Sequence, residues 1–237
     1  METQSLEGKV VLVTGSTRGI GKAIADAYQA EGARVFRNGR MDNQFPSHLV
    51  KGNTVYFDVR DREAVIGGIS TIYNINERLD ILVNNAGINE DSKVGKMENV
   101  QWDDVLATNL TGAFNCTRIA LPYLRQNKGQ IIYVSSIMAN DPKQGVANYA
   151  ASKAGVEAFA RVVSLEEAGN GISVLVVSPG FAETDMIARL SAEVRQRIQS
   201  QIPNGQFIQP ERIAQEVVQF SKVRGSLPPY VKKDLPY

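Results

Sequence analysis

The sequence predicts an α/β fold: one domain in which helices flank both faces of a doubly wound parallel sheet. Short apolar runs alternate with amphipathic stretches along all 237 residues, which is the order of strands and crossover helices. Most of these runs lack strict polar alternation, as expected for strands that are covered on both faces. No long linker, repeat or low-complexity tract divides the chain, and its length suits a single domain.

Six strands are expected where the apolar runs occur. They span Val10–Thr14, Arg34–Arg37, Thr54–Phe57, Ile81–Val83, Ile131–Ser135 and Ser173–Val177. Helices are expected between them, because apolar residues recur there at the spacing of one helical face. These residues include Ile20, Ile24, Ala27 and Tyr28, then Val105, Leu106 and Leu110, then Val156, Phe159 and Val163. Such sheets bind ligands beyond the carboxyl ends of their strands, so functional residues should closely follow the strands.

Composition and charge exclude several classes of protein. Lys and Arg (26) nearly balance Asp and Glu (25), and a net charge of +1 gives no global electrostatic reason to bind nucleic acid or an anionic membrane. One cysteine, Cys116, and one histidine, His48, exclude an intramolecular disulfide and a cysteine-rich or histidine-clustered metal site. Residues 1–8 are polar, and no apolar run reaches the length of a membrane span. We therefore expect a soluble, cytoplasmic protein without a metal site.

A glycine-rich loop follows the first predicted strand. It reads Thr14-Gly15-Ser16-Thr17-Arg18-Gly19-Ile20-Gly21 and leads into the first predicted helix. Glycines permit a tight turn and let a phosphate approach the backbone, while the helix start offers free N–H groups and a positive dipole end. An ordinary turn is the alternative, but the order of strand, loop and helix favours a dinucleotide site. The candidate binding residues in the loop are Gly15, Thr17, Arg18, Gly19, Ile20 and Gly21.

The loop and a second motif resemble the short-chain dehydrogenase/reductase family, and the resemblance runs from about Leu6 to about Phe220. The glycine spacing is similar to that of the family, and Asn84-Asn85-Ala86-Gly87 follows the fourth strand as it does there. The resemblance implies a Rossmann-type fold that binds a nicotinamide dinucleotide. It places Asn85, Ala86 and Gly87 beside the adenine and its ribose, and Asp58 and Val59 against the adenine. A helix cap is the alternative role for Asp58.

Basic residues near the expected adenine ribose favour NADP(H) over NAD(H). Arginine binds the additional 2′-phosphate of NADP through a planar fork, whereas NAD sites tend to place an acid at the end of the second strand. The chain has Arg40 there, no acid before Asp42, and Arg18 in the glycine loop. Arg37 is a third candidate, although the alternation of side chains along the second strand could direct it away from the cofactor. The alternative is that these arginines are merely exposed surface residues.

Tyr149 and Lys153 form the sharpest feature of the sequence. They are four residues apart in Tyr149-Ala150-Ala151-Ser152-Lys153, so they share one face of a helix. A free tyrosine has a pKa of about 10, and we expect the nearby ammonium to lower it by favouring the phenolate. The tyrosine could then give a proton to a carbonyl oxygen or take one from an alcohol.

Ser136 and Asn109 complete a catalytic set by resemblance to the family. Ser136 closes the fifth predicted strand thirteen residues before Tyr149, and this spacing favours it over Ser135, which we expect to point into the sheet layer. The resemblance implies that Ser136 orients the substrate oxygen and that Tyr149 protonates it. It implies that Lys153 holds the nicotinamide ribose and that Asn109 holds a water linking this lysine to solvent. A buried, hydrogen-bonded structural role is the alternative for Asn109.

The segment after the sixth predicted strand reads Pro179-Gly180-Phe181-Ala182-Glu183-Thr184-Asp185-Met186. The resemblance implies that Pro179, Gly180 and Thr184 contact the nicotinamide end of the cofactor. It also implies a substrate lid over residues 181–210. Three apolar side chains could line the pocket or belong to the core: Met186, Ile187 and Leu190.

Among family members, the chain is most similar to 3-oxoacyl-[acyl-carrier-protein] reductases, over residues 179–186 and 201–207. The resemblance implies NADPH-dependent reduction of a ketone or 3-oxoacyl group to the secondary alcohol. Acyl carrier protein is acidic, but the two positions that carry arginines in those enzymes hold Asn127 and Asn170 here. Arg125 and Lys128 could compensate, and a small ketone is the alternative substrate. An NAD-dependent alcohol dehydrogenase and a non-catalytic dinucleotide sensor are the alternative functions.

Two segments depart from the family pattern. Between Arg40 and Asp58 the chain is short and contains Pro46, so we expect a curtailed helix there. The tail 225–237 holds prolines at 228, 229 and 236, which argue against the regular seventh strand of the family. In the family this strand builds one subunit interface, and the helices that carry Asn109 and Tyr149 build the other. We therefore expect a homo-oligomer through those helices, either a dimer or a tetramer.

Overall fold

The computed structural model describes residues 5–40, 50–188, 191–223 and 229–236. Within them, eight strands form one sheet in the order β3-β4-β2-β1-β5-β6-β7-β8. All neighbouring strands run parallel except β3, which is antiparallel to β4. The strands are β1 (Val10–Val13), β2 (Arg34–Gly39), β3 (Val50–Lys51), β4 (Thr54–Tyr56), β5 (Ile81–Asn84), β6 (Gln130–Val134), β7 (Ser173–Pro179) and β8 (Tyr230–Leu235).

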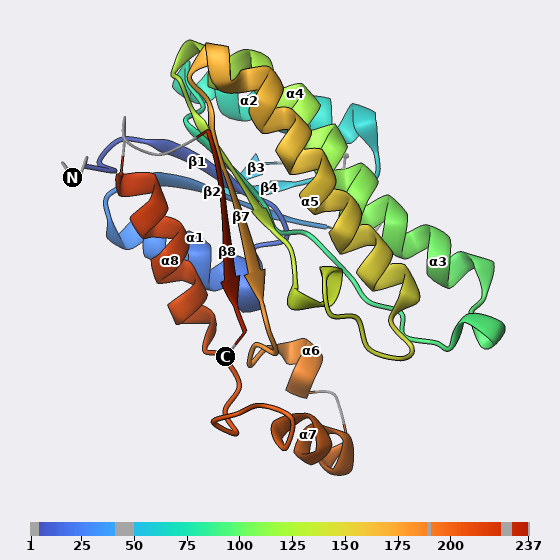
Figure 1. Cartoon of the computed structure of the whole chain (residues 1–237). Coiled ribbons are helices and arrows are strands. Elements are labelled where there is room, and N and C mark those ends of the chain that lie inside the picture. Colours follow the sequence, from blue (N-terminus) through green and yellow to red (C-terminus); the bar gives the residue numbers. More distant parts are fainter. Residues whose placement is uncertain (1–4, 41–49, 189–190, 224–228, 237) are drawn as a thin grey trace.

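Helices cover both faces of this sheet. Figure 1 shows α2, α4 and α5 on one face and α1 and α8 on the other, with α6 and α7 beyond the end of the sheet. The helices are α1 (Gly19–Ala30), α2 (Arg62–Asn76), α3 (Asn99–Leu106), α4 (Gly112–Gln126), α5 (Ala147–Glu167), α6 (Asp185–Ala188), α7 (Ala192–Gln199) and α8 (Pro210–Lys222). Short 3-10 or π-helical segments are also present: η1 (Val94–Lys96), η2 (Ala107–Thr111), η3 (Ile137–Ala139) and η4 (Ala168–Asn170). The predicted fold class is thus confirmed.

Two apolar cores form because the central strands are buried on both faces. In β1, Val10 and Leu12 pack toward α2, α4 and α5, whereas Val11 and Val13 pack toward α1 and α8. All four side chains are at most 2% exposed. Burying one such side chain contributes about 1.5–3 kcal/mol, so a continuous apolar run is the stable sequence for a strand in this position.

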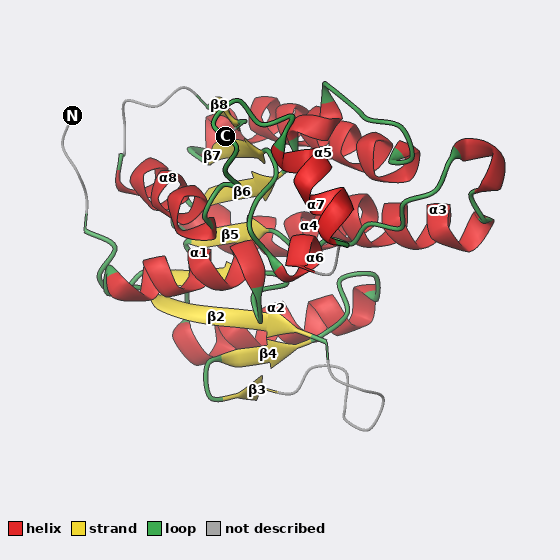
Figure 2. Cartoon of the chain, turned by 90° about the horizontal axis from the view of Figure 1, so that it is seen from below, coloured by secondary structure: helices red, strands yellow, loops and turns green. Residues whose placement is uncertain are grey.

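The C-terminal strand contradicts the sequence prediction. Residues 230–235 form β8, which pairs with β7 over its whole length. Pro229 and Pro236 flank this strand instead of interrupting it. In the sheet order β8 is an edge strand, so only one of its sides needs hydrogen-bond partners. The prolines are therefore compatible with it, and Figure 2 shows β8 next to β7 at one end of the sheet.

Some predictions concern residues outside the described ranges. Two of them concern the segment after Arg40, where the sequence has no acid before Asp42 and predicts a curtailed helix around Pro46. The other residues that lie outside the described ranges are His48, Leu190 and Pro228. The described part of the lid and tail comprises residues 181–188, 191–210 and 229–236. No helix among the described residues is both long and apolar enough to cross a membrane.

Candidate active site

The glycine loop makes a tight turn between β1 and α1. Gly15 and Gly19 have φ angles of 60° and 55°, in the left-handed region that favours glycine. A Cβ on Gly15 would lie 2.8 Å from the Cα of Ala86, and one on Gly21 would collide with the Asn85 amide. Helix α1 begins at Gly19, and no side chain caps it. Its first N–H groups are therefore available to a bound anion, which fits the pyrophosphate of a dinucleotide.

Thr14 fastens the glycine loop to the Asn-Asn-Ala-Gly motif. Its hydroxyl donates to the Val83 carbonyl at 3.2 Å and accepts from the N–H groups of Asn85 and Ala86 at 2.9 and 3.0 Å. The Asn85 amide in turn donates to the carbonyls of Thr14 and Gly15. The two motifs that suggested a dinucleotide site thus form one rigid edge at the ends of β1 and β5.

Asn38 braces the same loop from β2. Its side-chain oxygen accepts from the N–H of Gly15 at 3.1 Å, and its amide donates to the carbonyls of Val55 and Phe57. Asn38 is only 2% exposed. No supporting role was expected for Asn38 or Thr14 from the sequence, because their partners lie on strands far away in the chain.

The three candidate arginines differ in their surroundings. Arg18, in the glycine loop, and Arg40, directly after β2, are both exposed. The loop and the end of β2 are close together, because the Thr17 side chain lies against Gly39. Arg40 lies 3.9 Å from the Asp58 carboxylate. Arg37 instead donates to Asp26 on α1 at 2.6 Å. Arg18 and Arg40 therefore remain the candidates for the 2′-phosphate, and Arg37 is already engaged.

Asp58 is not the helix cap that was considered as its alternative role. Asp61 caps α2 by accepting from the N–H of Ala64. Burial would raise the pKa of Asp58, but hydrogen bonds from Arg60 and the charges of Arg60 and Arg40 hold it below its usual range. Val59 is 5% exposed and belongs to the core beside Gly112.

Ser135 and Ser136 follow β6 and point in different directions. The Ser135 hydroxyl donates to the Glu157 carboxylate at 2.9 Å, inside the layer between the sheet and α5. The Ser136 hydroxyl accepts from the N–H of Met138 at 3.2 Å and forms a hydrogen bond with Tyr149. Of the two serines, Ser136 is therefore the one that shares a site with Tyr149.

Tyr149 and Lys153 lie on the first turns of α5, where Lys153 is buried and Tyr149 is half-buried. The Lys153 ammonium lies 5.6 Å from the centre of the Tyr149 ring and donates to the Val134 carbonyl at 2.8 Å. Burial lowers the pKa of Lys153 to about 8. A Cβ on Gly87 would lie 3.5 Å from this ammonium, so the glycine leaves space in front of it.

The expected lowering of the tyrosine pKa does not occur. Burial raises the pKa of Tyr149, and the charge of Asp91 raises it further, while the hydrogen bond from Ser136 lowers it. Spacing in the sequence shows that the lysine is close, but not how far each group is removed from solvent. Removal from solvent disfavours the phenolate, so the pKa of Tyr149 is raised rather than lowered.

Asn109 lies in η2, a π-helical turn between α3 and α4. Its oxygen accepts from the N–H of Ile88 at 2.8 Å, and its amide donates to the Ile88 carbonyl and the Ser152 hydroxyl, each at 3.0 Å. The local disturbance of the helix is thus present. Asn109 is 2% exposed and joins the loop after Gly87 to the helix that carries Tyr149.

Asn148, immediately before Tyr149, was not recognised in the sequence. It is fully buried. Its amide donates to the carbonyls of Glu90 and Gln101 at 2.9 and 3.0 Å, and its oxygen accepts from the N–H of Tyr149 at 2.8 Å. This side chain therefore ties the loop after β5 to the start of α5.

The segment after β7 lies across the glycine turn. Thr184 lies next to Gly19, whose Cβ would be 3.5 Å from the threonine methyl. A groove of about 320 Å³ opens here, lined in part by Gly19, Thr184 and Pro210. Gly180 donates its N–H to the Leu235 carbonyl at 2.7 Å, and a Cβ on it would collide with the Pro236 carbonyl. Pro179 and Gly180 are thus held against the C-terminal strand.

The described part of residues 181–210 has an apolar cluster of its own. Ile187, Ile202 and Phe207 pack together and are 5–8% exposed. Ile187 therefore belongs to the internal packing of this segment. The side chain of Met186 and all of Leu190 lie outside what the structure describes.

Comparison with known proteins agrees with this geometry. A family model described as short chain dehydrogenase matches residues 9–195. The chain belongs to the short-chain dehydrogenase family. It is 38% identical to the 3-oxoacyl-[acyl-carrier-protein] reductase FabG of Aquifex aeolicus and 38% identical to that of Thermotoga maritima, over 90% of each chain. It is 36% identical to FabG of Escherichia coli, over 90% of this chain and 89% of the relative.

As a short-chain dehydrogenase, the chain is an NAD(P)-dependent oxidoreductase that acts on carbonyl or alcohol groups. The predicted family and enzyme class are thus confirmed.

The two positions where the related reductases carry arginines lie far from the candidate active site. Asn127 and Asn170 follow the C-terminal ends of α4 and α5. Because α5 has 21 residues and a helix rises about 1.5 Å per residue, Asn170 lies at the far end of α5 from Tyr149. Arg125 is paired there with the buried Glu167 carboxylate, so its charge is compensated.

Proposed function

We propose that this short-chain dehydrogenase reduces a ketone or 3-oxoacyl group to the secondary alcohol, with NADPH as the hydride donor. The observation that carries the proposal is the meeting of Ser136, Tyr149 and Lys153 at the carboxyl ends of β5 and β6, with Asn109 behind them. This meeting point lies beside the glycine turn that fits a dinucleotide.

The cofactor-binding residues are proposed from the same geometry. The pyrophosphate would lie on the turn and helix start, the 2′-phosphate near Arg18 and Arg40, and the nicotinamide by the ends of β6 and β7. The proposed set is Gly15, Thr17, Arg18, Gly19, Ile20, Gly21, Arg40, Asp58, Val59, Asn85, Ala86, Gly87, Tyr149, Lys153, Pro179, Gly180 and Thr184. Bound there, NADPH would supply the hydride, which is chemistry that side chains do not provide.

Each catalytic side chain has a role that its surroundings support. Ser136 donates a hydrogen bond to the substrate oxygen, and Tyr149 gives that oxygen its proton. Partial burial favours the phenol form of Tyr149, which is the form that can protonate a carbonyl. Lys153 holds the nicotinamide ribose, and Asn109 supports the resupply of protons to it.

The substrate class follows from the relatives. The relatives reported above are named as reductases of 3-oxoacyl groups on acyl carrier protein, so a 3-oxoacyl thioester is the first candidate. A small ketone is the second, because Asn127 and Asn170 are uncharged and Arg125 is paired with Glu167. Residues 181–210 would cover either substrate.

An NADPH-consumption assay tests the proposal. Acetoacetyl thioesters and small cyclic ketones would be offered to the wild-type chain, with the Tyr149→Phe variant as the control. We expect consumption by the wild type and not by the variant. No consumption across the panel, despite cofactor binding, would favour a dinucleotide sensor and contradict the proposal.

We also propose a homo-oligomer through α4 and α5. Phe114, Val162 and Leu165 on these helices are large apolar side chains that are 37, 50 and 75% exposed. Exposed apolar surface of this kind is typical of a subunit interface. The expected loss of the C-terminal strand was the reason to disfavour a tetramer, and β8 is present in the structure. Light scattering after size-exclusion chromatography should therefore show a dimer or a tetramer. A monomer would contradict this proposal.

A further inference from the structure

Glu157 is a buried carboxylate on α5, one helical turn after Lys153. It is 5% exposed. It accepts hydrogen bonds from Ser135 at 2.9 Å, Ser178 at 3.0 Å, Lys232 at 2.8 Å and Asn140 at 3.5 Å. The donors come from the end of β6, the end of β7, the edge strand β8 and the end of η3. One carboxylate thus joins three strands to the helix of the candidate active site.

The partners of Glu157 are direct neighbours of the proposed site residues. Ser135 precedes Ser136, and its hydroxyl also lies 3.4 Å from the Lys153 carbonyl. Ser178 precedes the Pro179-Gly180 segment. Any shift of Glu157 would therefore move the backbone of the proposed serine, lysine and nicotinamide-contacting residues together.

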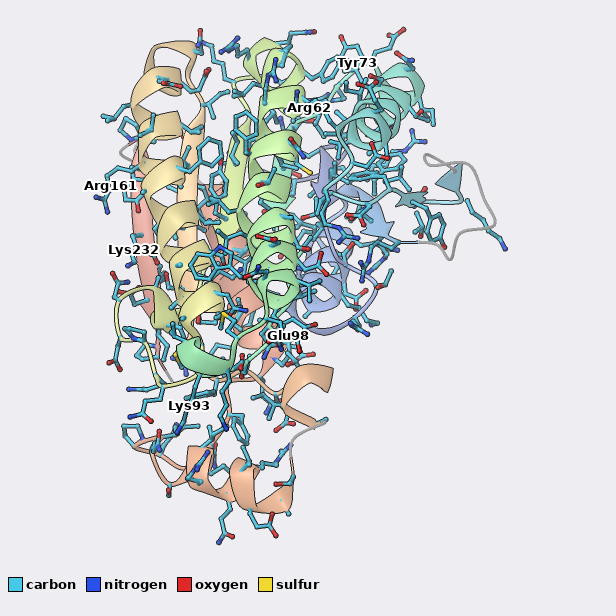
Figure 3. The ribbon with its side chains drawn as sticks, turned by 90° about the vertical axis from the view of Figure 1, so that its right-hand side faces the viewer. Arg62, Tyr73, Lys93, Glu98, Arg161 and Lys232 are labelled. Atoms are coloured by element: carbon cyan, nitrogen blue, oxygen red, sulfur yellow. The ribbon has the colours of Figure 1, made fainter. Side chains whose placement is uncertain are left out.

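Lys232 supplies the charge that makes this arrangement stable. A carboxylate in the interior is unfavourable unless it is paired and hydrogen-bonded. Burial would raise the pKa of Glu157, but the hydrogen bonds from Lys232, Ser135 and Ser178 together hold it below its usual range. Figure 3 shows Lys232 beside α5, near Arg161 of the same helix. The arginine lies over the Tyr230 ring at 5.9 Å, so two residues of β8 contact α5.

We propose that Glu157 and Lys232 are positioning residues for the reduction: through their ion pair, the C-terminal strand holds Ser136 and Lys153 in their working geometry. The inference rests on the proposed function, because it concerns the placement of those two residues. Neither Glu157 nor Lys232 contacts the reacting atoms. The C-terminal strand thereby becomes part of the catalytic framework rather than only the edge of the sheet.

Substitutions in the full-length chain test this proposal. The variants are Lys232→Met, Lys232→Arg, Glu157→Gln and the double variant Glu157→Gln/Lys232→Met. Lys233→Met is the matched control, because the neighbouring lysine pairs with Glu216 on α8, on the other face of the sheet. For each variant, kcat and KM for the carbonyl substrate, Kd for NADPH and Tm are measured on folded protein.

We expect Lys232→Met to lower kcat about 10-fold, since a small misplacement of catalytic groups has effects of this order or larger. KM and the Kd for NADPH should change by less than about 2-fold, because most of the proposed ligand contacts do not involve Ser136 or Lys153 and a small shift of these two acts mainly on the transition state. Lys232→Arg should recover most of kcat by keeping the charge. The double variant should be no slower than Glu157→Gln alone, because both substitutions remove the same interaction. Lys233→Met should match the wild type in kcat.

A merely structural ion pair gives a different result. In that case Tm falls in Lys232→Met while kcat per folded molecule stays at the wild-type value, and the proposal is overturned. If Lys232→Met does not fold, Glu157→Gln and Lys232→Arg decide the matter, because wild-type kcat in Glu157→Gln would equally overturn it.

Failure of the proposed function can be distinguished from failure of this inference. If the wild type reduces no carbonyl compound, backbone hydrogen exchange of residues 135–140, 178 and 180 replaces kcat as the readout. Exchange there should be faster in Lys232→Met than in Lys233→Met. Equal exchange in the two variants would overturn the positioning role.

Discussion

The Lys153 ammonium donates a hydrogen bond to the carbonyl oxygen of Val134, the last residue of β6, at 2.8 Å. This bond holds the lysine against the strand that Ser135 and Ser136 follow. It also anchors a charged group in a place that is only 5% exposed. The lysine that the site requires is thus held at a cost in folding free energy.

The pH dependence of stability should reveal this cost. Burial lowers the pKa of Lys153 to about 8 in the folded chain, whereas an unfolded lysine has a pKa of about 10.4. Below the folded pKa both states are protonated, and the cost of burying the charge is fully present. Between the two pKa values the unfolded state binds more protons, so this contribution to stability rises with pH by up to about 3 kcal/mol.

Lys153→Met removes the titrating group and tests whether this contribution to the free energy of unfolding rises with pH. Urea unfolding of both proteins without cofactor at pH 7 and at pH 10 gives the comparison. The variant should exceed the wild type in stability by more at pH 7 than at pH 10. An advantage that grows with pH would contradict the burial of a charged lysine.

Tyr149→Phe should abolish reduction while leaving the fold intact. The proton donor in a reaction of this kind contributes about 100-fold or more to the rate, so kcat should fall at least that far. The Kd for NADPH, measured by fluorescence titration, should change little, because the glycine turn is untouched. A variant that keeps most of the wild-type kcat would show that Tyr149 is not the proton donor.

The central strands could be predicted from the sequence because burial on both faces makes them apolar. The strand β8 was not predicted, since the prolines at 228, 229 and 236 argued against a regular strand there. In the structure Lys232 and Lys233 alternate across the edge of the sheet, where Lys232 meets Glu157 on α5 and Lys233 meets Glu216 on α8. Ion pairs here take the place of apolar contacts, and no local pattern shows where their partners are.

The candidate site shows the same division. Motifs marked the side chains that we propose to meet a ligand, such as Ser136 and Tyr149. The residues that support them, such as Asn38, Asn148 and Glu157, were missed, because their meaning depends on partners far away in the chain. The pKa of Tyr149 was assigned the wrong direction for a related reason, since its burial arises from packing that spacing does not describe.

Arg40→Ala should weaken NADPH binding selectively. If the exposed Arg40 guanidinium binds the 2′-phosphate, its loss removes a charge-assisted hydrogen bond of about 1.5–3 kcal/mol and raises the Kd for NADPH about 10-fold or more. The Kd for NADH, which lacks that phosphate, should stay within about 2-fold by the same reasoning. Arg37→Ala is the matched control, because Arg37 is paired with Asp26. Equal weakening of both cofactors by Arg40→Ala would argue against the NADP preference.

Asn148→Ala should disturb the substrate side of the site. The substitution leaves the carbonyls of Glu90 and Gln101 without their side-chain donor and the N–H of Tyr149 without its acceptor. These groups are partly buried, and a polar group left unsatisfied in the interior costs about 1–3 kcal/mol, so Tm should fall. Because the loop after β5 is released, KM for the carbonyl substrate should rise, while the Kd for NADPH should change less. The exposed Asn99 provides the control, and Asn99→Ala should leave Tm and KM at wild-type values. If Asn148→Ala lowers Tm but leaves KM unchanged, the asparagine stabilises α5 without shaping the substrate loop.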